Sequence, residues 1–331
     1  MNHRVVFMGT PDFAGPALEA LSRVPGVTIP LVVTQPDRPV GRGRTLQSPP
    51  VKIVADSLGL PAYQVASLKA PEQRQPIVNA QPDLIVVAAV GLILGRSILN
   101  LPARGCVNLH ASLLPKYRGA RPISAAIAQG DQETGVTLMR MERGLDTGPM
   151  LAVAREPILP NDTTSSLTAR LADIAADLLL QHLAAILSGI AVETPQPSGA
   201  TLTRPLVKAD GWIDWARSAI EIERHVRAMW PWPRAWTTLA GGTQFQIHEA
   251  QVEPATLDLA PGRAHSDRSG ILVGCGARTT MRIHRGQLSG GKALDGKQLA
   301  GGPAFRTELT LGSGDAPPVP GPLIVPLDDT K

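Results

Sequence analysis

Cysteine is almost absent from this chain of 331 residues, which contains only Cys106 and Cys275. Two cysteines so far apart cannot build a disulfide framework. Neither has a Cys or His neighbour at the spacing of a zinc ligand. We therefore expect no metal centre.

The sequence also lacks any uninterrupted apolar run near the roughly 18 residues that a membrane-spanning helix needs. Its first residues, MNHRVVFMG, enter a predicted strand at once and leave no room for a signal peptide. Hydrophobic residues make up 43% of the chain, a share typical of soluble globular proteins. We expect a cytoplasmic protein that does not bind membranes.

Charge of one sign does not dominate, because the net charge is only +4 at pH 7. Its distribution is more informative than its size. Residues 263–306 carry eight basic and two acidic side chains, a local charge of +6. Such a segment is typical of a polyanion-binding surface or of an ordinary solvated face, and charge alone does not separate the two.

Short runs rich in Val and Ile alternate with helical patterns in the first half of the chain. The predicted strands are residues 4–9, 27–34, 82–90, 105–111 and 135–141, and the predicted helices are 15–24, 51–60 and 121–130. The continuous apolarity of the strands indicates helices on both faces of the sheet. We therefore predict an α/β domain with a doubly wound, mostly parallel sheet. A leucine stripe predicts a longer helix over 163–187, with Asp162 as its N-cap.

Composition changes near residue 190 and divides the chain into further segments. Residues 190–208 lose periodicity and gain Pro, Gly and Thr, which indicates a linker between a domain at 1–189 and a second domain at 209–312. The second domain contains one helical pattern and then short alternating segments, which predict a small β-barrel. Residues 313–331 are rich in proline and are expected to be a disordered tail.

Ligands of a doubly wound sheet bind outside the carboxyl ends of its strands, so these positions are candidate sites. GTPDFAG at 9–15 lacks the GxGxxG spacing of a dinucleotide site, and GRGR at 41–44 lies in a loop that opens no helix. Dinucleotide binding is therefore weakly supported.

The stretch NLHASLLPKYRG, residues 108–119, follows the predicted strand at 105–111. Side chains two apart on a strand point to the same side, so Asn108 and His110 project together. An amide can stabilise an oxyanion, and a histidine can exchange protons near neutral pH. Taken alone, such a pair is more commonly explained as a hydrogen-bonded histidine at a strand end and an asparagine that caps a turn.

A carboxylate, Asp146, stands between two glycines in GLDTG, residues 144–148, directly after the next predicted strand. If it meets His110, it can orient the imidazole and stabilise its charged form beside a carbonyl under attack. The sequence contains no GxSxG nucleophile elbow. The nucleophile would therefore arrive with a substrate.

Six longer motifs carry a family resemblance: FMGTPDFA, TQPDRPVGRGRTLQSPPVK, AAVGLIL, NLHASLLPKYRGARPISAAIAQGD, ETGVTLMRMERGLDTG and IDWARSAIEIERHVRAMWPWPRAW. In their order and spacing the chain resembles the methionyl-tRNA formyltransferase family from about residue 4 to about residue 310. HASLLP followed at this distance by GLDTG is specific to folate-dependent formyltransferases. The arginine-rich loop and GQLSGGKAL favour the tRNA enzymes among them.

The resemblance implies transfer of a formyl group from 10-formyltetrahydrofolate to the amino group of methionine esterified to initiator tRNA. It makes residues 1–189 the catalytic domain and Asn108, His110 and Asp146 the catalytic trio. The residues expected to bind the folate are Ser112, Leu113, Leu114, Pro115, Val90 and Leu92. Val90 stands where the family usually has tyrosine, and Gly95 where it usually has proline.

The resemblance also implies two tRNA-binding regions in a monomeric protein. The loop 35–52 would read the acceptor stem, and an OB-like barrel at 209–312 would hold the RNA backbone. The expected tRNA contacts are Arg38, Arg42, Arg44, Lys52, Arg282, Arg285 and Lys292. Without the resemblance, a mobile solvated loop at 35–52 would be the more common interpretation. Lys116 and Arg118 would face either the 3′ end of the tRNA or the glutamate tail of the folate.

Two other functions remain open. A formyltransferase acting on an amino sugar or a glycinamide nucleotide, or a hydrolase using water, would keep the trio but is expected to lack the basic loop together with the second domain. An RNA-binding protein with an inactive formyltransferase domain is the other alternative, and the intact trio argues against it.

Overall fold

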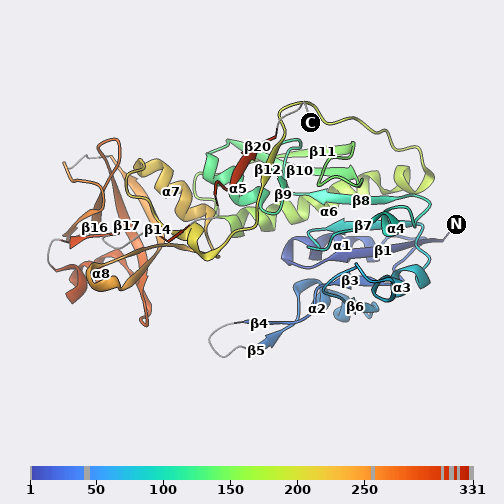
Figure 1. Cartoon of the computed structure of the whole chain (residues 1–331), viewed down its shortest axis with the longest axis horizontal. Helices are drawn as coiled ribbons and strands as arrows, with labels where there is room; N and C mark the ends of the chain where they lie inside the picture. Colours follow the sequence, from blue (N-terminus) through green and yellow to red (C-terminus); the bar gives the residue numbers. More distant parts are fainter. Residues whose placement is uncertain are drawn as a thin grey trace.

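The computed structural model describes residues 2–40, 45–254, 258–306, 309–312, 317–318 and 321–327. Two bodies lie side by side along the long axis, the larger formed by the first half of the chain (Figure 1). The larger body is built on a sheet with the order β11 (Met150–Pro157), β10 (Glu133–Arg140), β8 (Cys106–His110), β7 (Leu84–Ala88), β1 (His3–Gly9), β3 (Val32–Thr34) and β6 (Ala62–Gln64), with β2 (Val27–Thr28) also paired to β1.

The sheet is parallel from β8 to β6, as the apolar runs predicted. At its other edge β10 runs antiparallel to β8, and β11 antiparallel to β10. β11 was not predicted, because an edge strand that alternates between half-buried and exposed residues lacks a continuous apolar run.

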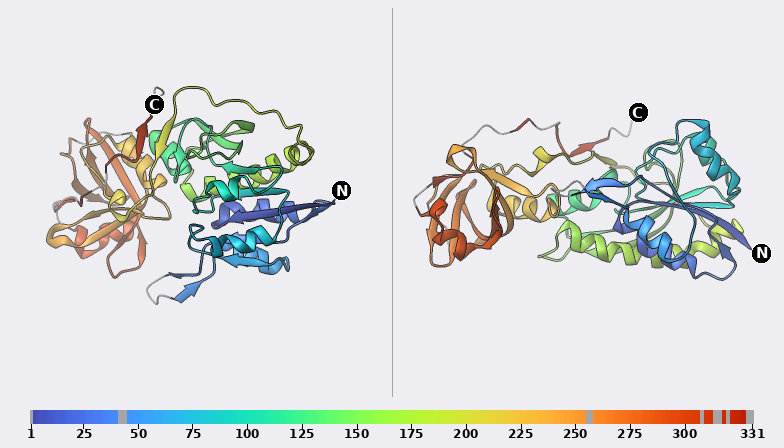
Figure 2. Two further views of the ribbon diagram at one scale, coloured as in Figure 1. Left: turned by 45° about the vertical axis from the view of Figure 1, so that its right-hand side comes forward. Right: turned by 90° about the horizontal axis from the view of Figure 1, so that it is seen from below.

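Helices cover both faces of this sheet (Figure 2). Alternate strand residues enter two separate apolar clusters, with Val5 and Phe7 in one and Val6 and Met8 in the other. The first cluster lies under η1 (Asp12–Ala14), α1 (Gly15–Ser22), α2 (Pro50–Ser57), α5 (Pro122–Gln129) and α6 (Thr164–Ser188), and the second under α3 (Pro71–Asn79) and α4 (Arg96–Leu99). Burial on both faces confirms the doubly wound architecture.

The long helix α6 begins one residue later than expected. The hydroxyl of Thr163 accepts a hydrogen bond from the Ser166 amide, so Thr163 is the N-cap. Asp162, the expected cap, is buried and forms an ion pair with Arg170 at 2.7 Å. The expectation of Asp162 as cap was wrong, because two polar residues stand together at this end and the arginine takes the carboxylate.

By length and composition alone α6 could cross a membrane, contrary to the expectation from the sequence. Half of its most apolar 18-residue stretch is buried inside the protein, where α6 packs against α1, β10 and β11. Core helices of soluble proteins pass the same test of length and composition.

The smaller body is a curled antiparallel sheet. Its order is β13 (Ala235–Thr238), β14 (Gln244–Glu253), β17 (Thr279–Leu288), β16 (Gly270–Cys275), β15 (Arg263–Asp267) and β19 (Leu309–Thr310), with β18 (Ala293–Asp295) paired to β17. The sheet closes around Phe245 and Phe305, whose rings are 5.1 Å apart. Short helical elements accompany it: η2 (Lys208–Gly211), α7 (Ala219–Ala228), η3 (Ala240–Gly242), α8 (Gly296–Gly301) and η4 (Pro303–Phe305). This half-barrel is consistent with the expected OB-like barrel.

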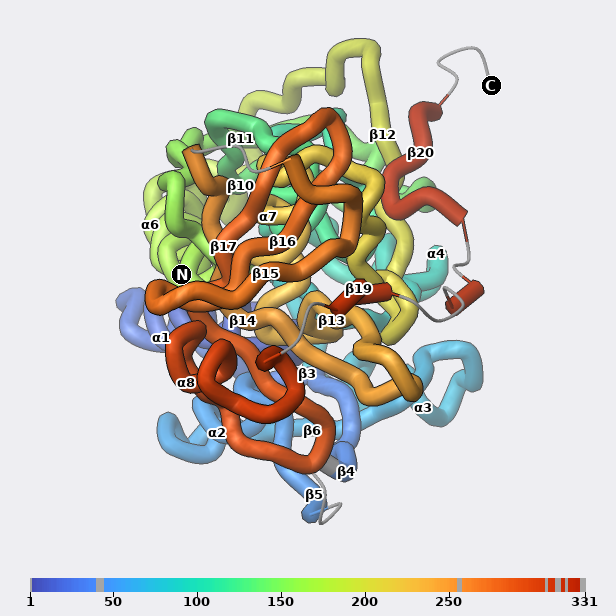
Figure 3. The backbone as a smooth tube through the Cα atoms, turned by 90° about the vertical axis from the view of Figure 1, so that its left-hand side faces the viewer, coloured from blue at the N-terminus to red at the C-terminus, as the bar shows by residue number. Residues whose placement is uncertain are grey.

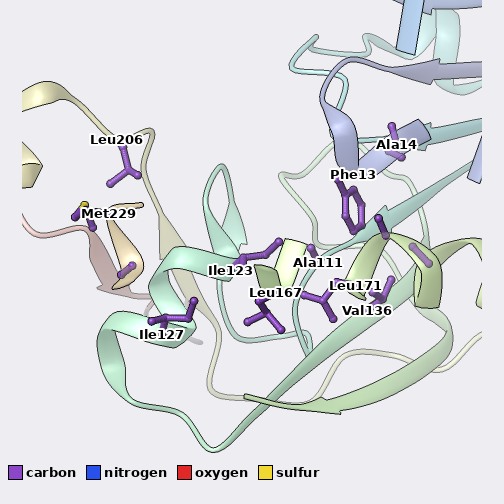
Figure 4. Packing of buried hydrophobic residues seen from close by; sticks show 14 of the residues in the cluster. Phe13, Ala14, Ala111, Ile123, Ile127, Val136, Leu167, Leu171, Leu206 and Met229 are labelled. Atoms are coloured by element: carbon purple, nitrogen blue, oxygen red, sulfur yellow. The ribbon is translucent and has the colours of Figure 1, made fainter. Parts of the chain in front are cut away.

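The two bodies are joined by an apolar junction. Ile123 and Ile127 of α5 lie near Leu206 and Met229 in the same apolar cluster (Figure 4). α5 also packs against α7. The assignment of separate catalytic and tRNA-binding domains stays a prediction.

A second connection is a small sheet of β9 (Arg118–Gly119), β12 (Thr201–Thr203) and β20 (Ile324–Pro326). β12 pairs with β9 in parallel and with β20 in antiparallel orientation, and Figure 3 shows β20 beside β12. The predicted disorder of the tail is therefore wrong for residues 324–326, which supply hydrogen bonds to the free edge of β12.

Candidate active site

The end of β8 places two polar side chains in the interior. Asn108 and His110 are only 8% and 5% exposed, while the alternate residues Val107 and Leu109 enter the core cluster of the other face. The alternation of a strand thus brings Asn108 and His110 to one side, as predicted.

The structure brings Asp146 to the same place. Its Oδ2 lies 3.5 Å from His110 Nδ1 and accepts a 2.8 Å hydrogen bond from the Gly119 amide, and its Oδ1 accepts from Asn108 Nδ2 at 3.4 Å. Asp146 has φ 51°, in the left-handed region that aspartate tolerates better than most residues. The three predicted catalytic residues therefore form one cluster.

Gly148 explains how this loop returns so closely to β10. A Cβ atom at Gly148 would lie 2.0 Å from the carbonyl oxygen of Arg140. Only glycine allows this approach, which directs Asp146 back over the end of β8.

His110 uses both ring nitrogens within the protein. Nε2 lies 2.9 Å from the carbonyl oxygen of Tyr117. A carbonyl only accepts, so Nε2–H is the donor and Nδ1 is the nitrogen that faces Asp146. The backbone of Tyr117 and Gly119 was not identified from the sequence, because backbone groups carry no side-chain signal.

The segment 112–116, expected to bind the folate, is a tight turn beside the trio. Ser112 is fully buried and its hydroxyl donates to the Lys116 carbonyl at 2.6 Å. Thr137 of β10 donates to the Ser112 carbonyl at 2.7 Å and accepts from the Leu114 amide at 3.2 Å. The turn is thereby tied to the sheet.

Most side chains of the expected folate set are buried in this conformation. Leu114 and Val90 are 6% and 4% exposed, and Pro115 is buried too. Leu113 and Leu92 are half-buried and remain partly accessible. Ile93 and Leu145 are the large exposed apolar side chains of the loops after β7 and around Asp146. Neither was singled out from the sequence, where Ile93 continues an apolar run.

The expected tRNA loop contains an antiparallel pair of strands, β4 (Arg38–Val40) and β5 (Thr45–Gln47), which projects from the larger body (Figure 1). Arg38 is exposed there and hydrogen-bonds to Gln35. Lys52 lies in α2 instead and pairs with Asp56 at 2.6 Å. Arg42 and Arg44 lie outside the described residues.

The basic residues expected on the smaller body divide into two kinds. Arg282 is mostly buried between Glu253 and Asp267, at 2.7 and 3.0 Å. Arg285 and Lys292 are exposed, with Arg285 3.8 Å from Glu249.

Arg285 and Lys292 line a cavity of about 610 Å³ between the half-barrel and the start of α6. Arg234 lies over the Trp230 ring at 5.1 Å, and His248 packs on the same ring. Burial, then the charges of Arg234 and Arg285, lowers the pKa of His248 to about 4. The lining therefore carries two arginines and one lysine against a single carboxylate, Glu249, with a neutral imidazole at pH 7.

Lys116 and Arg118, whose ligand the sequence leaves open, have different contacts in the structure. Arg118 donates to the side-chain oxygen of Gln196 through Nε and Nη2 at 3.1 and 2.7 Å. Lys116 is exposed, with Nζ 3.8 Å from Asp131.

Within the described part of the chain, no group of His, Cys, Asp and Glu could hold a metal ion.

Comparison with known sequences matches both bodies. Residues 3–183 match the family described as formyl transferase, and residues 205–304 match the family described as formyl transferase, C-terminal domain. The methionyl-tRNA formyltransferase of Marinobacter nauticus is 46% identical over 301 residues, which cover 90% of this chain and 96% of the relative. That of Myxococcus xanthus is 46% identical over 275 residues, covering 82% and 86%.

Solved structures share the fold at low identity. A sugar 3N-formyl transferase, WlaRD, has a TM-score of 0.62 at 13% identity, covering 86% of this chain and 97% of its own. The N-formyltransferase from Helicobacter canadensis has a TM-score of 0.61 at 16% identity, covering 86% and 99%. At these identities the likeness shows a shared fold.

Proposed function

Because the chain belongs to the methionyl-tRNA formyltransferase family, we propose that Asn108, His110 and Asp146 are its catalytic residues. The enzyme transfers the formyl group of 10-formyltetrahydrofolate to the amino group of methionine on initiator tRNA, giving the formylated aminoacyl-tRNA used in translation initiation. The supporting observation is the buried cluster of an amide, an imidazole and a carboxylate at the end of β8. This donor set fits a formyl carbonyl, whose oxygen gains negative charge during attack by an amine.

In this mechanism Asn108 supplies a neutral hydrogen-bond donor. Its amide nitrogen carries two protons, and one is directed to Asp146. The second is available to the formyl oxygen as the new C–N bond forms. Because Asn108 is buried, such a bond is stronger than it would be in water.

His110 and Asp146 handle charge and protons. Because Nε2–H is held by the Tyr117 carbonyl, the protonated imidazole carries its second N–H on Nδ1. The contact of Nδ1 with Asp146 Oδ2, at 3.5 Å, is at the outer limit of a hydrogen bond, so this N–H is also available to the formyl oxygen. Asp146 stabilises the charged imidazole and helps to accept the proton that the amine loses. The bond from the formyl carbon to the folate nitrogen then breaks, and a proton returns to that nitrogen.

The folate is proposed to lie against the turn 112–116 and the loop after β7. Leu113 and Leu92 are the partly accessible apolar side chains of the expected set. The other four residues of the set are buried, which fits a role in supporting the residues that face the folate: Ser112, Leu114, Pro115 and Val90.

For the tRNA we propose contacts on two surfaces. One is the loop 35–52, with Arg38, Arg42 and Arg44. The other is the half-barrel, where Arg285 and Lys292 are exposed, whereas Arg282 and Lys52 are already paired with carboxylates. Phosphate contacts of this kind position the RNA without reading its sequence. We further propose that the enzyme acts as a cytoplasmic monomer that does not bind membranes.

The test is formation of formylmethionyl-tRNA from 10-formyltetrahydrofolate and methionyl initiator tRNA. We expect Asn108→Ala and His110→Ala each to lower single-turnover rates on the order of 100-fold, because each removes one donor at the oxyanion. His182→Ala, on the half-buried face of α6, is the matched control and should retain the wild-type rate.

Full single-turnover activity of His110→Ala would reject the assigned role. Parallel assays with free methionine, an amino sugar nucleotide and water as acceptors separate the alternatives. Product with one of these acceptors and none with the charged tRNA would reject the proposed substrate.

A further inference from the structure

Gln196 lies between the two matched segments of the chain, in the stretch predicted as a linker, and its side chain reaches the catalytic loop. Nε2 donates to the carbonyl oxygens of Asp146 and Gly148, at 2.7 and 2.8 Å. Oε1 accepts from Arg118 through two hydrogen bonds. The amide thus uses both of its N–H donors and its oxygen at once.

Both N–H groups of Gln196 therefore bind the loop 144–148, in which Asp146 has an unfavourable backbone conformation. Asp146 is in the left-handed region, which costs a non-glycine residue free energy and persists only where surrounding contacts fix it. Its carboxylate is held by Gly119, Asn108 and His110, but its carbonyl is held by Gln196. Gly148, on the other side of the turn, is held by the same amide.

Gln196 itself is fixed from both sides of its segment. Prolines at 195 and 197 restrict the backbone. Thr194 exchanges two backbone hydrogen bonds with Met150, at 2.7 and 2.8 Å. On the other side β12 pairs with β9, the strand that contains Arg118.

We propose that Gln196 is a positioning residue for formyl transfer, braced by Arg118, that holds the Asp146 loop where its carboxylate meets His110. The inference rests on the proposed function of the trio. Gln196 touches no reacting atom and acts through Asp146. Its loss should therefore lower turnover while leaving the affinity for both substrates intact.

The test compares Gln196→Ala, Gln196→Glu and the control Ser198→Ala, an exposed residue of the same segment. We expect Gln196→Ala to lower kcat about ten- to a hundredfold, with KM for the folate donor and for methionyl-tRNA within about twofold of wild type. Gln196→Glu keeps an acceptor for Arg118 but has no N–H and turns an oxygen toward two carbonyls. It should be at least as impaired, while Ser198→Ala should match the wild type.

A second readout does not depend on activity. Hydrogen exchange should accelerate in Gln196→Ala for the Gly119 amide, which donates to Asp146, and in the loop 144–148, with an unchanged midpoint of thermal unfolding. Wild-type kcat in Gln196→Ala, or unchanged exchange at these amides, would overturn the inference. A wild-type protein that forms no formylmethionyl-tRNA while Gln196→Ala still shows faster exchange would reject the proposed function and leave the positioning role standing.

Discussion

At the scale of single residues, the site depends on side chains whose polar atoms are matched one to one. Asp146 accepts from a backbone amide and an asparagine, and its carbonyl accepts from a glutamine. Such matching fixes the position of a buried carboxylate, because each unpaired polar atom would cost free energy.

His225 is an exception to this matching of polar atoms. His225 of α7 is half-buried, and its Nε2 atom is buried without a hydrogen-bond partner among the described residues. Burial lowers its pKa to about 4, with a smaller contribution from the charge of Arg217. The folded protein therefore holds this imidazole neutral at a pH where an unfolded chain would bind a proton.

A pH dependence of stability follows. Between pH 6.5 and about 4 the unfolded chain binds more protons at His225 than the folded chain, so the free energy of unfolding falls as the pH falls. We expect this residue to contribute a loss of up to about 2 kcal/mol between pH 7 and pH 5. Urea unfolding of wild type and His225→Gln at both pH values measures it. An identical loss in the variant would contradict the assignment.

At the scale of elements, two arginines of β17 have different surroundings. Arg282 pairs across the sheet with Glu253 of β14 and Asp267 of β15. Arg285, three residues on, is 55% exposed at the cavity that Lys292 also lines. The family resemblance assigned both to the tRNA, because the sequence does not show which carboxylates of other strands come close to each arginine.

Substitution of these residues should affect different quantities. We expect Arg285→Gln and Lys292→Gln to weaken tRNA binding and to reduce its salt dependence by about one unit of slope each. Arg282→Gln should instead lower the free energy of unfolding by about 1 kcal/mol or more, since it leaves two carboxylates unpaired, with little change in the salt slope. Filter binding at several salt concentrations and urea unfolding measure the two effects. A loss of slope in Arg282→Gln equal to that in Arg285→Gln would contradict this division.

At the scale of the whole molecule, the chain returns from the half-barrel to the larger body through β20. Arg204 connects the same region, with an ion pair to Asp210 at 2.6 Å and a hydrogen bond to the Gly321 carbonyl at 2.8 Å. The tail thus adds a strand to β12, which in turn supports the backbone around Gly119.

Deletion of residues 313–331 should therefore destabilise the junction. Backbone hydrogen bonds contribute about 1 kcal/mol each, so we expect the thermal midpoint to fall by about 2–5 °C. A chain ending at Leu327, which keeps β20, is the matched control and should melt like the full chain. Equal midpoints for the full chain and the longer deletion would show that β20 adds no stability.

The sequence by itself determined the α/β fold, the order of most elements and the placement of Asn108 and His110 on one side of a strand. It could do so because strand alternation and apolar runs are local properties, and because Asn108 and His110 lie two residues apart on one strand. Only the tertiary structure decided which partners these residues have. Tyr117 and Gly119 contribute backbone atoms, Gln196 is fifty residues from Asp146, and Arg282 meets carboxylates on other strands. Contacts between distant segments depend on how the chain packs, and no local pattern encodes them.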